Sequence, residues 1–351
     1  MKKTIIFAGL LLSVGCFAQT NVANYQPGSN QNGVTYFLPK TVVEIEVVAT
    51  KTTYTPGEFC KYADRYLRLT GISDIADEYW EIGSITAKTT GVPDLESVFT
   101  VELKDKTVAP LMGLTKEGII ESINIESEKK SIPAIPLTPA MKSKLNPRDF
   151  MTEEILMASS SAKMAELVAK EIYNIRESKN AILRGQADNM PKDGESLKLM
   201  MAKMEEQEQA MLSLFTGTKE QETKTFTIPL VPKTDITKEI VFRFSKKLGI
   251  VAKDDLVGAP IYLSLTDLKT VPLMDVKAKK NKKNPEGIVY NVPGKAKVSI
   301  FDSQNIYFDG ELLVTQFGNQ ETLTDNLFNK KVTTTVRFSP ETGGILKIGR
   351  E

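Results

Sequence analysis

A cluster of carboxylates stands directly before the only tryptophan of the chain. Asp74, Asp77 and Glu78 precede Tyr79 and Trp80. Two carboxylates can act as general acid and base in glycoside hydrolysis, and an aromatic ring can stack on a sugar. Glycosidases bring their carboxylates together through the fold, however, and an acidic surface turn leading into a strand explains the same residues. We favour the surface turn and keep a hydrolase acting on glycan or peptide through carboxylates as the alternative.

A second candidate is a serine with a lysine one helical turn behind it. Ser160 and Lys163 have the Ser-x-x-Lys spacing of serine acyl-enzymes. The Lys-Thr-Gly that accompanies it is missing, since residues 88–91 read Lys-Thr-Thr-Gly. We interpret Ser160 or Ser161 as the N-cap of a helix.

The composition excludes several kinds of chemistry. The chain has no histidine, which removes Ser-His-Asp triads, Cys-His pairs and His-ligated zinc. Only oxygen ligands could hold a metal; Asp302, Asn305 and Asp309 could face one ion, but Asp309-Gly310 is typical of a tight hairpin turn. There is no glycine-rich phosphate loop. We therefore predict no catalytic residue, no cofactor and no metal site.

The cysteine and lysine residues do not point to a specific chemistry either. Cys60 shares one helical face with Phe59, Ala63 and Leu67, which favours a small buried core residue over a reactive thiol. With 45 basic and 44 acidic residues, the net charge of +1 gives no general attraction to nucleic acid. Five lysines lie close together without interleaved aromatics, which favours a solvated loop, with a partner surface as the second interpretation: Lys277, Lys279, Lys280, Lys282 and Lys283.

The first residues predict export. Lys2 and Lys3 precede an apolar run, 5–14, which is too short to span a membrane and is typical of a signal peptide over 1–18. Cleavage between Ala18 and Gln19 would leave a soluble chain, and the alternative is lipidation of Cys16. We favour soluble export to the periplasm or the periphery of the outer membrane, with no transmembrane span in the mature chain.

The first half of the chain alternates like a β-rich domain, 32–126, after a flexible tail, 19–31. Short strands are predicted at 34–36, 41–49, 79–86 and 97–103, and a hairpin over 108–125. Pro39 separates the first two strands. Thr55-Pro56-Gly57-Glu58 has the pattern of a capping box and predicts a helix from Thr55 to about Leu69.

A proline-rich stretch, 127–147, is the predicted linker, and a helical region, 148–217, follows it. Apolar residues recur at helical spacing from Ser161 to Leu183, and again from an N-cap at Asp193 to Gly217. We expect the two helices to form a long antiparallel hairpin. The second helix has a methionine-rich face, which we interpret as core, with a partner surface as the alternative: Met200, Met201, Met204 and Met211.

From 218 to 351 the pattern returns to short strands, as in a second β domain. Strands are predicted at 225–231, 239–244, 261–265, 288–292, 297–301, 311–315, 332–338 and 345–348. The fold class is therefore α+β, with antiparallel sheets in a sandwich or open barrel, one short N-terminal helix, and the helical hairpin between the β regions. Residues 33–39 and 287–293 share the pattern Gly-x-x-Tyr-x-x-Pro, so the β regions are either related sheets or merely alike locally.

Several segments in order resemble an exported family of the Bacteroidota that is described as a domain of unknown function. They are Gly33–Thr41, Tyr54–Phe59, Gly91–Asp94, Ile172–Ser178, Met190–Gly194 and Leu214–Gly217. The resemblance implies an envelope location and no catalytic residues. We expect a non-catalytic protein that binds another envelope protein or a cell-surface polymer, and no nucleic acid.

Overall fold

A computed structural model describes residues 21–24, 33–102, 111–125, 145–186, 193–272, 287–323 and 334–350. The helical elements are two 3₁₀ turns (Cys60–Tyr62 and Pro147–Phe150), α1 (Ala63–Leu67), α2 (Glu153–Leu156), α3 (Ser161–Leu183) and α4 (Gly194–Thr216). The strands are β1 (Asn21–Asn24), β2 (Gly33–Thr55), β3 (Asp77–Glu102), β4 (Met112–Leu114), β5 (Ile120–Ile123), β6 (Thr218–Leu230), β7 (Ile236–Ser245), β8 (Gly249–Val251), β9 (Ala259–Asp267), β10 (Ile288–Phe301), β11 (Ile306–Leu323), β12 (Thr334–Phe338) and β13 (Ile345–Arg350).

The strands form three open antiparallel sheets, which confirms the predicted α+β class with antiparallel sheets. Their orders are β1-β3-β2-β6, β11-β10-β9-β7-β8 and β13-β12-β5-β4. The first two sheets pack face to face over a sandwich core that includes Val43, Val47, Leu263 and Val298. A second apolar cluster, the base core, includes residues of the third sheet and of the starts of β2 and β10.

The two β regions do not form separate domains. β6 pairs with β2 along the first sheet, and β12 pairs with β5 in the third. The division into β domains at 32–126 and 218–351 is therefore wrong, because strands from both ends of the chain complete the same sheets. Part of the predicted tail is also a strand, since β1 pairs with β3.

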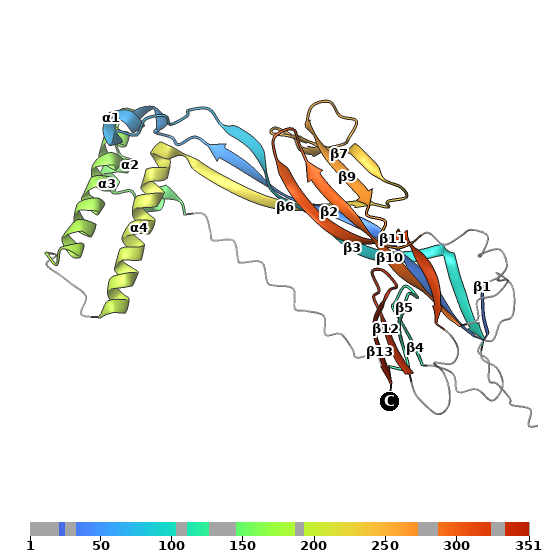
Figure 1. The fold of residues 1–351 in the computed structure, drawn as a ribbon. Helices are drawn as coiled ribbons and strands as arrows, with labels where there is room; N and C mark the ends of the chain where they lie inside the picture. The colour runs from blue at the N-terminus through green and yellow to red at the C-terminus, as the bar shows by residue number, and fades with distance from the viewer. Residues whose placement is uncertain are drawn as a thin grey trace, which may run out of the picture.

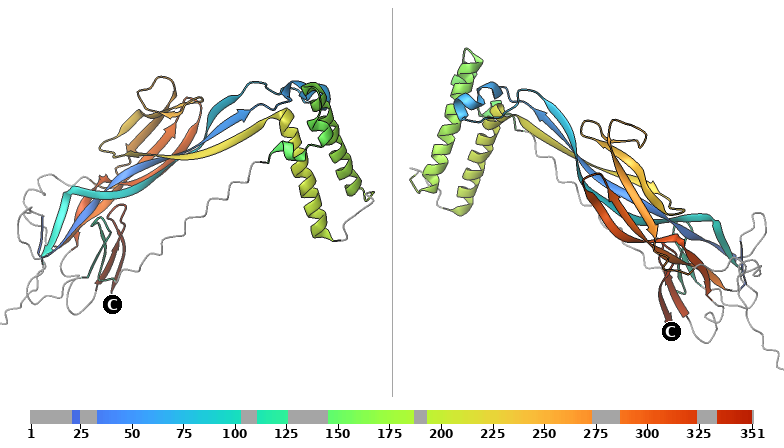
Figure 2. Two further views of the ribbon diagram at one scale, coloured as in Figure 1. Left: turned by 180° about the vertical axis from the view of Figure 1, so that it is seen from behind. Right: turned by 45° about the horizontal axis from the view of Figure 1, so that its top comes forward.

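Three strands continue beyond the sandwich as a narrow ribbon, which we call the arm: residues 50–55 of β2, 77–81 of β3 and 218–223 of β6 (Figures 1 and 2). In β6, residues 219–225 are all exposed. At the far end of the arm, α1, α2, α3 and α4 share a third apolar cluster, the helix core, which includes Phe59, Val168, Ile172 and Phe215. The helices therefore have a core of their own, away from the β body.

The helix predicted from Thr55 to Leu69 is largely wrong. Thr55 pairs with Thr218 at the end of the β2–β6 ladder, so its capping box is not used. The chain then folds against α4, where Phe59 N donates to Leu214 O at 2.7 Å and a Cβ on Gly57 would lie 2.2 Å from the same oxygen. Tertiary contact thus overrides the local helical pattern, and only residues 60–67 are helical.

Prolines and turns also misled the strand predictions. β2 runs through Pro39 because the ladder is interrupted there by a register shift, so the missing N–H costs no pairing. β3 is likewise one long strand. The turn predicted at Asp309-Gly310 lies inside β11, and the actual reversal is at Asp302, whose Oδ1 accepts from the N–H groups of Gln304 and Asn305 at 2.6 Å.

The two long helices begin and end where the sequence predicts. Ser160 Oγ accepts from Lys163 N at 3.3 Å, and Asp193 Oδ1 accepts from Ser196 N at 2.7 Å. Gly217, at φ 75°, follows the last residue of α4. Within the described ranges, no helix is long and apolar enough to cross a membrane.

Candidate functional site

The acidic residues before Trp80 lie on and beside the arm, and each faces a lysine. Asp74 is 3.9 Å from Lys61, Asp77 pairs with Lys247, and Glu78 pairs with Lys51. All three carboxylate side chains are about half exposed. The described residues therefore provide no unpaired carboxylate dyad next to the tryptophan.

Trp80 joins the arm to the β body. A Cβ on Gly249 would lie 3.0 Å from the indole, so the β7–β8 turn covers one part of the ring. Lys224 Nζ is 5.8 Å from the ring centroid, and Trp80 N donates to Lys246 O at 2.7 Å. The indole has structural neighbours instead of the open face that a stacked sugar needs.

The other candidate nucleophiles have structural roles or open surroundings. Ser160 is the N-cap of α3, and Lys163 Nζ lies 2.9 Å from Glu166. Cys60 is half-buried, so its prediction as a buried core residue is wrong. Because residues 60–62 form a 3₁₀ turn, Cys60 does not share the buried face of Phe59 and Ala63. It lines an open hollow of about 400 Å³ with Lys61, Asp64 and Asp74.

No group of three potential metal-ligating side chains occurs in the described part of the chain. Asp302 Oδ2 accepts from Tyr307 at 2.7 Å, and Asp309 pairs with Lys297 at 2.8 Å. Burial and the hydrogen bond to Asp302 raise the pKa of Tyr307 to about 12. The residues proposed for one ion thus have different partners.

The lysine-rich segment, the signal peptide with Cys16, Ala18 and Gln19, and most of the predicted linker lie outside the described residues. The predicted methionine face can be placed. Met211 is fully buried, Met204 packs against the helix core, and Met200 and Met201 are half-buried. These methionines mainly fill the space between helices, whereas the large exposed apolar side chains of α3 and α4 are Tyr173, Leu183 and Leu199.

An ion network holds α3 against α4, which lie antiparallel (Figures 1 and 2). Glu208 accepts from Arg176 Nε at 2.6 Å and from Lys179 Nζ at 2.9 Å, and Lys179 also pairs with Glu205. Burial alone would raise the pKa of Glu208, but the hydrogen bonds from Arg176 and Lys179 outweigh it and lower the pKa. The hydrogen bond from Lys179 lowers the pKa of Glu205.

Acid is expected to loosen the helix pair. Because the folded state favours deprotonated Glu208 and Glu205, their contribution to stability is present above the unfolded glutamate pKa of about 4.3 and is lost as the pH falls through the lowered folded values. Glu208→Gln should cost about 1–3 kcal/mol near neutral pH and remove much of the acid dependence. Thermal unfolding, followed by circular dichroism at several pH values, measures the loss of stability and its dependence on acid. Glu195→Gln, at a highly exposed pair with Lys198, should change neither.

The two Gly-x-x-Tyr-x-x-Pro segments open β2 and β10 and meet in the β body. Tyr36 donates its hydroxyl to Val289 O at 3.1 Å and accepts from Val289 N at 3.0 Å. Asn291 Nδ2 donates to Pro39 O at 2.8 Å and to Thr342 O at 3.0 Å. The repeated sequence therefore marks the place where the two long hairpins are joined.

Both hairpins bulge at this junction. Residues 93–98 of β3 stand opposite 37–39 of β2, and residues 314–319 of β11 stand opposite 292–294 of β10. Close to both prolines lies the β12–β13 turn: a Cβ on Gly343, at φ 70°, would be 2.8 Å from Pro39, and one on Gly344 would be 3.2 Å from Pro293. The two repeated segments thus bulge at corresponding positions, and both lie next to the β12–β13 turn.

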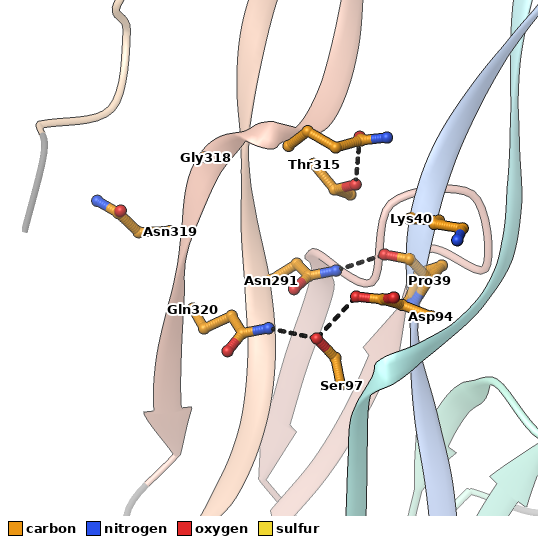
Figure 3. A pocket seen from close by; sticks show the side chains of 10 residues that line it. Pro39, Lys40, Asp94, Ser97, Asn291, Thr315, Gly318, Asn319 and Gln320 are labelled. Atoms are coloured by element: carbon orange, nitrogen blue, oxygen red, sulfur yellow. Dashed lines mark hydrogen bonds between the residues drawn. The ribbon is translucent and has the colours of Figure 1, made fainter. Parts of the chain in front are cut away.

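A polar pocket of about 230 Å³ lies between the two bulges (Figure 3). Asp94 and Ser97 come from the bulge of β3, and Asn319 and Gln320 come from the end of the bulge of β11 and the residue after it. Ser97 Oγ lies 2.8 Å from Asp94 Oδ2 and accepts from Gln320 Nε2 at 3.1 Å. Asp94 ends one of the segments that carry the family resemblance, and the repeated segments that end at Pro39 and Pro293 lie beside the pocket, but neither signal predicts a binding site.

Comparison with the curated proteins and with the solved structures finds no match. The model of one family, a domain of unknown function (DUF4831), matches residues 32–346, from the start of β2 into β13. That range includes the arm, the helix pair and the pocket between the bulges. The chain therefore belongs to the DUF4831 family.

Proposed function

We propose that this protein is exported to the cell envelope and acts there as a non-catalytic binding or scaffolding protein, presenting its helix pair to another envelope protein. The observation that carries this proposal is the separation of the helix core from the β body by the narrow, three-stranded arm. A separately packed element at the end of a narrow ribbon can reach a partner without disturbing the sandwich. Soluble export, periplasmic or at the outer-membrane periphery, is supported by the signal-like N-terminus.

The hydrolase alternative receives less support. Asp74, Asp77 and Glu78 each face a lysine, and Trp80 is engaged by Gly249 and Lys224. Two carboxylates about 5–9.5 Å apart around an open cleft would favour hydrolysis. The surface arrangement of these ion pairs instead favours a binding role.

A capture experiment tests the proposed role of the helix pair. The mature protein with Leu183→Ser and Leu199→Ser, at positions 73% and 63% exposed, should fold normally and recover about tenfold less of its crosslinked partner from native cells. The matched control, Leu248→Ser with Ile306→Ser, alters side chains on the β body that are 57% and 72% exposed and should retain the partner. Equal recovery by both variants would rule out binding through this end of the helix pair.

A further inference from the structure

We propose that the pocket between the bulges of β3 and β11 is a binding site for a small, neutral, hydroxyl-rich ligand, a single saccharide unit. This site lies in the β body and does not involve the helix pair. The proposal is therefore independent of the partner proposed above.

The pocket combines one positive group, one negative group and neutral amides. Lys40 has no hydrogen-bond or ion-pair partner for its ammonium group among the described residues. Each oxygen of Asp94 accepts one bond, from Glu96 N at 3.3 Å and from Ser97 Oγ at 2.8 Å, and has lone pairs left. Asn291 Oδ1 and Gln320 Oε1 also have no donor in the described ranges.

This set of groups matches hydroxyls better than a net charge. A ligand hydroxyl can accept from Lys40 and donate to Asp94 or to an amide oxygen at the same time. A cation would be repelled by Lys40, and an anion would be repelled by Asp94. An apolar ligand would leave all of these groups desolvated and without hydrogen-bond partners. The volume of about 230 Å³ is below the ~300–1,000 Å³ typical of drug-sized ligands, which limits the occupant to about one sugar ring.

The walls are held in place before any ligand arrives. Thr41 N donates to Thr315 Oγ1 at 2.9 Å, Thr315 N donates to Thr41 Oγ1 at 3.0 Å, and Gln316 Nε2 donates to Thr41 O at 2.7 Å. These bonds join β2 to β11, which have no shared ladder. Because these bonds already hold this wall of the pocket, ordering it costs little conformational entropy on binding.

Saturation-transfer NMR and calorimetry on the mature full-length protein test the site with glucose, galactose, mannose and N-acetylglucosamine as probes. At least one should bind with a Kd of about 1–10 mM, as expected for a ligand of this size without an aromatic platform. Lys40→Met removes only the unpaired ammonium, and Asp94→Asn removes the charge while keeping the shape. Each should weaken binding about fivefold or more.

Lys297→Met is the matched control, since Lys297 also lies on a strand of the β body but pairs with Asp309 outside the pocket. It should bind the sugar like the parent protein, and unchanged thermal unfolding of Lys40→Met would show that its loss is local. The proposal is overturned if none of the four sugars binds, if binding survives both pocket substitutions, or if a zwitterion such as glycine is bound instead.

Discussion

Replacing Phe215 by alanine is expected to unfold the helices while the β body stays folded. Phe215 is fully buried in the helix core, and its ring lies 5.7 Å from that of Phe59, which follows the arm. Removing a buried phenylalanine side chain costs about 3–5 kcal/mol through lost burial and the cavity it leaves. The helix core contains no residue of the sandwich core, so this loss falls on one module alone.

Two probes separate the modules. Far-ultraviolet circular dichroism follows the helices, and the fluorescence of Trp80, the only tryptophan, follows the junction of arm and body. In Phe215→Ala the dichroism transition should move to much lower denaturant while the fluorescence transition stays in place. Leu199→Ala, at a position 63% exposed on the same helix, should shift neither the dichroism transition nor the fluorescence transition. A joint shift of both probes in Phe215→Ala would show that helices and body unfold as one unit.

Replacing Asn291 by alanine is expected to destabilise the β body strongly. Its side-chain amide donates to the carbonyls of Pro39 and Thr342, and only 5% of the residue is exposed. Without it, two carbonyl groups lose their donor, each at a cost of about 1–3 kcal/mol. We expect the free energy of unfolding to fall by about 2–4 kcal/mol.

The chain offers a closely matched control in Asn319. It lies on the neighbouring strand and also donates its amide to a proline carbonyl, that of Pro272, but through a solvent-exposed hydrogen bond at a half-buried position. Asn319→Ala should cost about 1 kcal/mol or less. Urea unfolding of both variants, followed by Trp80 fluorescence, gives the comparison. If the two costs are equal, water reaches the carbonyls that Asn291 serves, and the junction is less closed than its burial indicates.

The sequence predicted the elements governed by local signals. The caps at Ser160 and Asp193 define the starts of α3 and α4, and alternation located most strands. The helix at Thr55 failed because pairing with Thr218, far along the chain, decides that segment. The predicted break between strands at Pro39 was wrong because a bulge, which no local pattern indicates, removes the need for the N–H that proline lacks.

The pocket between the bulges could not be predicted from the sequence either, because it also depends on contacts between distant parts of the chain. Asp94 and Gln320 come together only when two hairpins meet, and the sequence pattern assigns no chemistry to either residue. In the sequence, the acidic residues before Trp80 were a stronger candidate for a catalytic site, because neighbouring positions in the chain suggested that the carboxylates lie close together in space. In the fold those carboxylates face lysines on different elements.

The sharing of sheets between the two ends of the chain sets the order in which this protein can fold. β4 and β5 can pair with each other, but the second edge of β5 must wait for β12, and Asn124 Nδ2 donates to Thr334 O at 2.9 Å across 210 residues of chain. During synthesis β5 therefore keeps one unpaired edge until β12 emerges. Closing such distant pairs is slow, and a chain cut short before β12 leaves the base core without Val336 and Phe338. A late truncation should thus harm this fold as much as an early one.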